Sequence, residues 1–302
     1  MNDPQAVNGS RVESRAEPSG STSLVWWLVF KQELTELWLG GRVLNFLILF
    51  SVLMSIMAFL LATNNELSLT PPKLMELITL QAAITFGLFI GLVIAAESIT
   101  GERERATLEA LLLTPTSRRQ IVAGKFLAAL SPWPAAMVLS IPYMVTLSQG
   151  DAVLGSALLW GALTGSLLAI AFTGLGMLVS IWSNSNKISL FVSLLIYLLC
   201  LLPSQLPGQV QATPALTFIQ TVDPVEATNQ FLQKTLVNSQ PQVGSAVDPG
   251  PMGQVWIFLA GSAVVTALIL GLLFLVAAPR LRLEGEGASM IRPIWNRMEA
   301  IE

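Results

Sequence analysis

The sequence has 302 residues, of which 53% are hydrophobic and 12% charged, with a formal net charge of −3. Soluble domains carry about 25% charged residues, so this composition excludes an ordinary soluble protein and indicates an all-α integral membrane protein. The sequence contains no histidine and one cysteine, Cys200, which excludes zinc or haem ligation by imidazole, a Ser/His catalytic pair and an internal disulfide.

The first 39 residues divide into a polar tail and an amphipathic helix. Residues 1–22 are largely Asn, Ser, Gly, Glu and Arg, and we expect them to form a disordered tail. Over residues 23–39, apolar side chains recur with helical spacing: Trp26, Phe30, Leu34 and Leu37, with Trp27 and Trp38 beside them. The opposite face carries Lys31, Gln32, Thr35 and Glu36. A Trp-rich helix of this kind lies flat in the membrane interface, and the alternative of a buried soluble helix lacks a soluble domain to bury it.

Six apolar stretches follow, at residues 43–62, 77–96, 126–147, 153–182, 188–202 and 255–278. Five of them reach the roughly 20 residues that a helix needs to cross a bilayer core. The stretch at 188–202 reaches that length if its helix continues past its apolar flanks. We therefore predict six transmembrane helices, the third of which should be kinked or broken by Pro132, Pro134 and Pro142.

Two of these stretches carry glycines spaced one helical turn apart, Gly87 with Gly91 and Gly161 with Gly165. Such pairs allow helices to approach closely, so we expect these four residues to be helix-packing positions. The partner helix belongs either to this chain or to a second copy of it.

The distribution of Lys and Arg indicates the orientation in the membrane. With six spans and both termini on one side, that side holds all of the 16 basic residues except Lys73 and Lys234, which makes 14 against 2. Basic loops remain in the cytoplasm. Both termini, including the tail at 281–302, and the segment around residues 97–125 are therefore expected to be cytoplasmic.

The segment at 203–254 is then external, and it contains one helix signal. Asp223, Pro224 and Glu226 form a typical helix start, and the helix should run to about Val237. Its predicted buried face consists of Val225, Thr228, Leu232 and Leu236. This helix either gates an exit path or covers the bundle.

The most charged part of the chain is internal, with nine charged residues between Glu97 and Lys125. Thr100 is expected to cap a helix that begins at Gly101 and ends near Thr114, because Pro115 disfavours helical geometry at the residue before it. One side of this helix carries Glu102, Arg105 and Glu109, and another carries Leu108, Leu111 and Leu112. Exposed leucines require cover, either from a protein partner or from lipid headgroups, and these residues alone favour neither. The run Ser117-Arg118-Arg119-Gln120 predicts a capping box for the next helix, which carries Lys125 into the third stretch.

Residues 97–125 contain the pattern E-x-x-x-x-E-R-E-R-x-T-L-E-x-L-L-x-T-P-x-S-R-x-x-I-x-x-G-K. This pattern resembles the signature of the permease subunits of ABC type-2 transporters, six-helix exporters that pair with a separate ATP-binding subunit. The resemblance extends over about residues 23–280 and includes the Trp-rich helix, the six spans and the external segment. Ala106 departs from the family, which usually has glycine there, and favours a helix more strongly.

The resemblance implies that residues 101–113 form a cytoplasmic coupling helix that docks in a groove of the ATP-binding subunit. Thr114, Pro115 and Ser117 would set the following turn. Arg105 and Glu109 also have the spacing of an ordinary ion pair within one helix. The coupling residues implied are Glu97, Gly101, Glu102, Arg103, Arg105, Thr107, Leu108, Glu109, Leu112, Thr114, Pro115, Arg118, Gly124 and Lys125.

The chain lacks the G-x-x-x-x-G-K-[ST] loop that cradles ATP phosphates, so we expect another chain to hydrolyse ATP. The resemblance implies that ATP and Mg are bound by that partner, that this chain holds no cofactor or metal, and that two permease copies or paralogues form the substrate path. It further implies a lipid bilayer of the bacterial-type plasma (inner) membrane, and no nucleic acid partner.

Three other classes of protein have to be weighed. A secondary transporter is disfavoured because the predicted spans carry almost no ionisable residues. A membrane-embedded enzyme is disfavoured because no clustered carboxylates or paired nucleophile and base occur. A non-transporting membrane scaffold or assembly protein is compatible with the composition, and only the coupling-helix pattern speaks against it.

Overall fold

The computed structural model describes residues 25–63, 72–105, 117–148, 154–205, 223–236 and 252–277. The regular structure within these ranges is entirely helical. The tails at 1–22 and 281–302, and most of the segment at 203–254, lie outside them. The elements are α1 (Val25–Leu39), α2 (Arg42–Thr63), α3 (Pro72–Glu97), α4 (Thr100–Glu104), α6 (Arg118–Leu130), α7 (Pro132–Ser148), α8 (Leu154–Trp182), α9 (Asn186–Gln205), α12 (Pro224–Leu236), α13 (Met252–Gly271) and the π-helix η2 (Leu272–Ala277).

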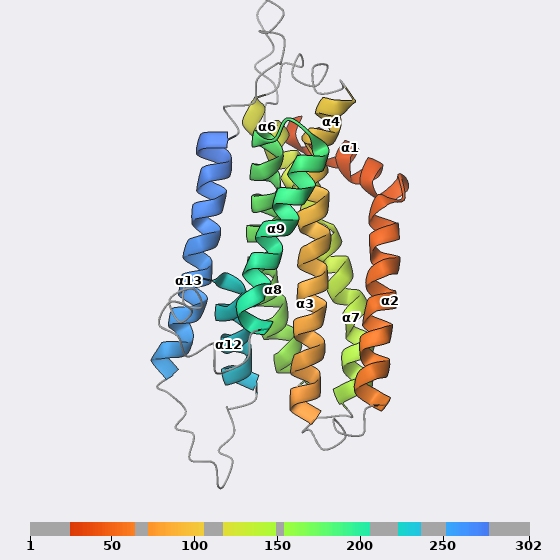
Figure 1. Cartoon of the computed structure of the whole chain (residues 1–302), viewed down its shortest axis with the longest axis vertical. Coiled ribbons are helices and arrows are strands. Elements are labelled where there is room, and N and C mark those ends of the chain that lie inside the picture. Colours follow the sequence, from red (N-terminus) through yellow and green to blue (C-terminus); the bar gives the residue numbers. More distant parts are fainter. Residues whose placement is uncertain are drawn as a thin grey trace, which may run out of the picture.

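The long helices run side by side along the longest axis of the molecule (Figure 1). Helices α1, α4 and α6 lie together at one end, which we call the α4 end, and α12 lies toward the opposite end. Five helical stretches are long and apolar enough to cross a membrane: Arg42–Thr63, Lys73–Glu104, Arg118–Leu147, Leu154–Trp182 and Leu259–Ala277. Their length and composition match five of the predicted spans.

The sixth predicted span corresponds to α9, whose apolar part, Asn186–Leu202, is shorter than the other five. The helix itself continues past both flanks of the predicted stretch and has 20 residues. At 1.5 Å per residue this is about 30 Å, the thickness of a hydrocarbon core.

The third predicted span is broken, as its prolines indicate. Helix α6 ends at Leu130, Ser131 forms a turn, and α7 begins at Pro132. Proline suits this first helical position because the missing N–H would have no partner there. Pro142 lies inside α7. The break means that α6 and α7 are two separate rods joined at Ser131.

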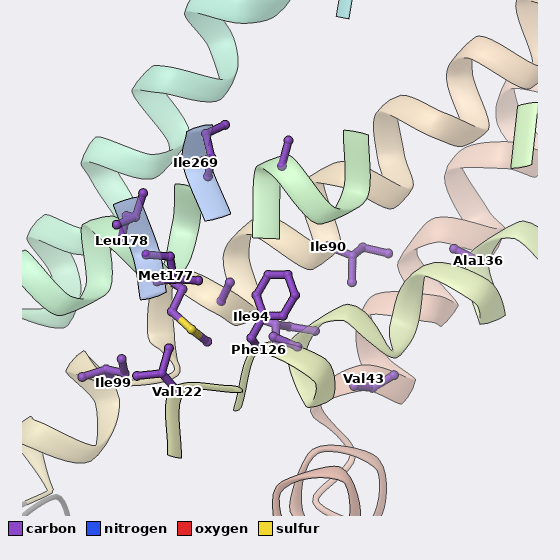
Figure 2. Close-up of a cluster of buried hydrophobic side chains, with 14 of the residues drawn as sticks. Val43, Ile90, Ile94, Ile99, Val122, Phe126, Ala136, Met177, Leu178 and Ile269 are labelled. Atoms are coloured by element: carbon purple, nitrogen blue, oxygen red, sulfur yellow. The ribbon is translucent and has the colours of Figure 1, made fainter. Parts of the chain in front are cut away.

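One of the two apolar cores contains residues of α2, α3, α6 and α8, and α6 packs there against α3 and α8. Figure 2 shows Ile94, Phe126 and Met177, from α3, α6 and α8, directed toward one another. Ile269, from α13, joins the same cluster. This core connects the α4 end to the long helices of the bundle.

The second core is built around Trp133 on α7, which is 5% exposed. Its indole lies between two glycines, because a Cβ atom would come within 2.8 Å of it at Gly87 on α3 and within 2.5 Å of it at Gly165 on α8. The indole Nε1 donates a hydrogen bond of 3.0 Å to Ser166 Oγ. The other two predicted packing glycines also face this chain: a Cβ would lie 3.0 Å from Thr173 Oγ1 at Gly91 and 2.5 Å from Leu80 Cδ1 at Gly161.

Helix α12 forms as predicted and is described as far as Leu236. Asp223 Oδ1 accepts a hydrogen bond of 2.9 Å from the backbone N–H of Val225, so the aspartate caps the helix. The predicted apolar face is buried, and the helix packs against α8, α9 and α13. These contacts show α12 covering the side of the bundle at the end opposite α4.

Candidate functional site

The charged segment begins with the short helix α4, which follows α3 after a turn at Ser98 and Ile99. The prediction that Thr100 caps this helix is wrong. Thr100 is the first helical residue, and Ile99 occupies the capping position without a side-chain cap. The Thr100 hydroxyl is buried and lies 2.9 Å from both the Ala96 carbonyl oxygen and Asn186 Oδ1, so it contacts neighbouring helices instead of its own first turn.

The rest of the predicted coupling helix falls outside the described residues. That applies to the predicted coupling residues Thr107, Leu108, Glu109, Leu112, Thr114 and Pro115, and to Ala106. The next described residue is Ser117, and here the predicted capping box is confirmed. Ser117 Oγ accepts a hydrogen bond from the Gln120 N–H, and Gln120 Oε1 accepts one from the Ser117 N–H, both at 3.3 Å.

A buried lysine connects three elements at the α4 end. Lys125, on α6, has its Nζ 2.6 Å from Glu33 Oε1 on α1 and 2.6 Å from Glu102 Oε1 on α4. The lysine side chain is 1% exposed, and the two carboxylates are 18% and 25% exposed. A buried ammonium is unfavourable unless it is paired and hydrogen-bonded, and here two carboxylates supply that pairing. We call these three residues the Lys125 triad.

Helix α1 is held along α6 at two further points. At Gly124, an added Cβ would lie 2.9 Å from Val29 Cγ1 and 3.1 Å from the Phe30 nitrogen, so glycine is what allows the two helices to cross this closely. Further along, Trp38 Nε1 donates a hydrogen bond of 3.1 Å to Ser131 Oγ, at the break between α6 and α7. Helices α1 and α6 therefore form one packed pair.

The opposite side of α4 is bonded to the turn between α8 and α9. Glu104 Oε1 accepts hydrogen bonds from the Asn186 N–H at 2.7 Å and from Ser185 Oγ at 3.2 Å. Because Asn186 is the first residue of α9, Glu104 caps that helix from a distant part of the chain. Arg103 donates to the Ser183 carbonyl oxygen on the same turn.

Ser180 secures the start of α4 from α8. Its hydroxyl accepts from the backbone N–H groups of Ile99, at 3.2 Å, and Thr100, at 3.1 Å. These are two of the N–H groups that a helix start leaves without internal partners. The start of α4 is therefore fixed to α8 as well as to α9.

Four of the residues in this site were not singled out from the sequence: Glu33, Glu104, Ser180 and Asn186. The sequence does contain a signal for Glu33. This residue lies one turn from Phe30 and Leu37 on the apolar face of α1, where a carboxylate requires a partner. The run Ser183-Asn184-Ser185-Asn186 also marks a helix start.

A charged cavity of about 60 Å³ lies beside the Lys125 triad, between α1, α2, α3 and α4. The predicted residues Glu97, Gly101 and Arg105 line it, together with Glu36 and Arg42. Arg118 is exposed at the start of α6. The structure thus brings Glu97, Gly101, Glu102, Arg105 and Lys125 together, whereas Arg103 faces the α8–α9 turn.

The arrangement is suited to mechanical linkage. Within the described residues, no group of three or more His, Cys, Asp or Glu side chains is placed to hold a metal ion. The hydrogen bonds and the ion pair of α4 instead join this short helix to α6, α8 and α9, and Lys125 extends the connection to α1.

Two comparisons with known proteins bear on this arrangement. A family model described as ABC-2 family transporter protein matches residues 27–279. The ABC transporter permease protein NatB of Bacillus subtilis (strain 168) is 30% identical over 136 residues, which cover 38% of this chain and 34% of that relative. The chain thus matches about a third of the length of this relative.

Proposed function

Because the chain belongs to the ABC-2 family of transporter proteins, we propose that it is the transmembrane permease subunit of an ATP-driven ABC exporter. Two six-helix copies, or one copy and a paralogue, enclose the substrate path. A separate subunit binds ATP and Mg, hydrolyses the ATP and drives the movement. The partial match to NatB, itself an ABC transporter permease by name, supports this assignment.

The observation that carries the proposal is the fixed base of α4. The helix leaves the end of α3 and is bonded on both sides to long helices of the bundle, immediately before the segment that resembles a coupling helix. A force applied to that segment would reach the bundle through these bonds. This is the connection that a permease requires if ATP binding elsewhere is to change its conformation.

Contacts within the permease support two different roles for the proposed coupling residues. Glu102 and Arg103 make contacts within the permease, so we assign them to the base of the coupling helix. Arg105 is exposed at the end of α4. We assign contact with the ATP-binding subunit to Arg105 and to the residues that follow it as far as Leu112.

The remaining parts of the proposal concern the membrane. With α9 as the sixth span, both termini and the α4 end lie in the cytoplasm, and α12 lies outside. The excess of Lys and Arg on one side of a six-span arrangement supports this orientation and a bacterial-type plasma membrane. The competing function is a membrane scaffold that neither binds an ATP-binding subunit nor transports.

The test is capture of the ATP-binding subunit with the affinity-tagged permease from its own cells in mild detergent. The subunit is identified by a G-x-x-x-x-G-K-[ST] sequence and by ATP hydrolysis. Leu108→Arg should remove it, or uncouple its hydrolysis from transport, because a charge would enter an apolar contact.

Leu39→Arg is the matched control, because it makes the same change at a residue of the α4 end that is 83% exposed. Both variants should be inserted in the membrane at normal levels. If the unmodified permease captures no such subunit, or if Leu108→Arg retains a full complement with normal coupled transport, the scaffold is the better description.

A further inference from the structure

The two glutamates of α4 are bonded to different parts of the bundle. Glu102 contacts Lys125 on α6, and Glu104 contacts the first residue of α9. Residues two positions apart on a helix point in nearly opposite directions, about 200° apart. The five-residue helix α4 therefore extends one carboxylate to each side.

The bond on the α6 side leads on to α1. Lys125 holds Glu102 and Glu33 with the same ammonium group, so a displacement of α4 pulls on both partner helices. The close crossing at Gly124 and the bond from Trp38 to Ser131 then make α1 and α6 move together, and Ser131 immediately precedes α7.

The bond on the α9 side ends at a helix start. Glu104 accepts from the Asn186 N–H, which has no acceptor inside α9, and its negative charge faces the positive end of the α9 dipole. Arg103 reinforces the contact through the Ser183 carbonyl oxygen. A displacement of α4 therefore acts on α9 along a route separate from the Lys125 triad.

We propose that α4 is a two-armed connector, in which Glu102, through Lys125, positions α1 and α6, and Glu104 positions α9. This inference rests on the proposed function, because it assumes that an ATP-binding subunit moves α4. Glu102 and Glu104 are positioning residues, the first for α1 and α6 and the second for α9. The two routes should be separable by substitution.

The test measures two distances between spin labels in the complex of permease and ATP-binding subunit, in a Cys200→Ala background. Gly155, at the opposite end of α8, carries the reference label, since an added side chain there meets nothing within 4 Å. The second label is placed on α1 at Lys31 or on α9 at Lys187, both exposed. Each distance is recorded without nucleotide and with Mg-ATP and vanadate.

We expect both distances to shift on addition of Mg-ATP and vanadate. Glu102→Ala should abolish the shift on α1 and leave the shift on α9, and Glu104→Ala should do the reverse. Glu36→Ala is the control, because it removes a carboxylate from the wall of the same cavity without breaking either arm, and both shifts should remain. Alanine removes the accepting oxygens, whereas the amide oxygen of a glutamine at 104 would still accept from the Asn186 N–H.

Two results with the variants would overturn the connector. In the first, either substitution leaves its own shift intact; in the second, one substitution abolishes both shifts, which would mean that α4 is lost as a whole. An unmodified complex that hydrolyses ATP with no shift at either label also overturns it, while the proposed function stands. Failure of the permease to retain an ATP-binding subunit overturns the proposed function itself.

Discussion

Replacing Gly165 with alanine should destabilise the bundle because the indole of Trp133 has no room to move away. The new Cβ would lie 2.5 Å from Cζ2 and 2.6 Å from Cη2 of Trp133, and 3.3 Å from Ile84 Cγ1. Favourable carbon contacts begin near 3.5 Å, so the ring has to shift by about 1 Å. On its other side, the ring already lies against α3 at Gly87.

The size of the effect follows from three contributions. Overpacking of this kind costs about 1–3 kcal/mol. The shift also breaks the bond from Trp133 Nε1 to Ser166 Oγ, which adds about 1 kcal/mol. The higher helix propensity of alanine returns about 1 kcal/mol. We therefore expect a net loss of about 1–3 kcal/mol.

The assay is unfolding of the purified permease in mild detergent by titration with a denaturing detergent. Gly155→Ala is the control on the same helix, because its Cβ meets nothing within 4 Å, and it should be neutral or slightly stabilising. In the Trp133→Phe background, which removes the clashing ring atoms, Gly165→Ala should lose most of its cost. The reasoning fails if Gly165→Ala and the unmodified protein unfold at the same concentration of denaturing detergent, or if both alanine variants are equally destabilised.

Three further predictions concern charge. Lys125→Met leaves two partly buried carboxylates that had shared one ammonium, so it should cost about 3 kcal/mol in the same titration, the low end for a broken buried pair, and neutralising both carboxylates as well should restore most of the loss. Burial raises the pKa of Asp223 from 3.8 to about 6. The folded state therefore binds this proton more tightly than the unfolded state does. The resulting stabilisation, at most about 3 kcal/mol, is fully present below about pH 4 and is lost as the pH rises through 6. Asp223→Asn keeps a helix cap, so thermal unfolding between pH 4 and 8 should lose this dependence, and an unchanged profile would refute the assignment. In intact cells without the native cysteine, a cysteine at Lys234 should react with an impermeant thiol reagent and one at Arg118 should not; labelling at Arg118 would contradict the six-span orientation.

The parts of the fold that were predictable are those in which the signal is local. Apolar stretches predicted the long helices, and Pro132 marked the break between α6 and α7. The helix caps at Ser117 and Asp223 were predictable because each involves residues only two or three positions apart. The error at Thr100 shows the limit of such signals. Its hydroxyl has the chemistry of a cap, but burial against α9 gives it a different partner.

The candidate site was less predictable because its contacts join distant parts of the chain. Glu33 and Lys125 are 92 residues apart, and Glu104 and Asn186 are 82 apart. The pattern around residues 97–125 located the segment, but it did not predict that the Glu102 carboxylate contacts Lys125. No periodicity within one helix distinguishes a carboxylate that faces water from one that faces a lysine on another helix.

The pairing of Glu33 with Lys125 has a consequence for biogenesis. Translation starts from the N-terminus, so α2 and α3 are both synthesised before the helix on which α1 packs exists. During that interval, the apolar side of α1, with Trp26 and Phe30, lacks the α6 surface on which it packs, and the bilayer surface is an available apolar environment. We therefore expect the nascent α1 to lie at the membrane surface until α6, with Lys125, has been synthesised.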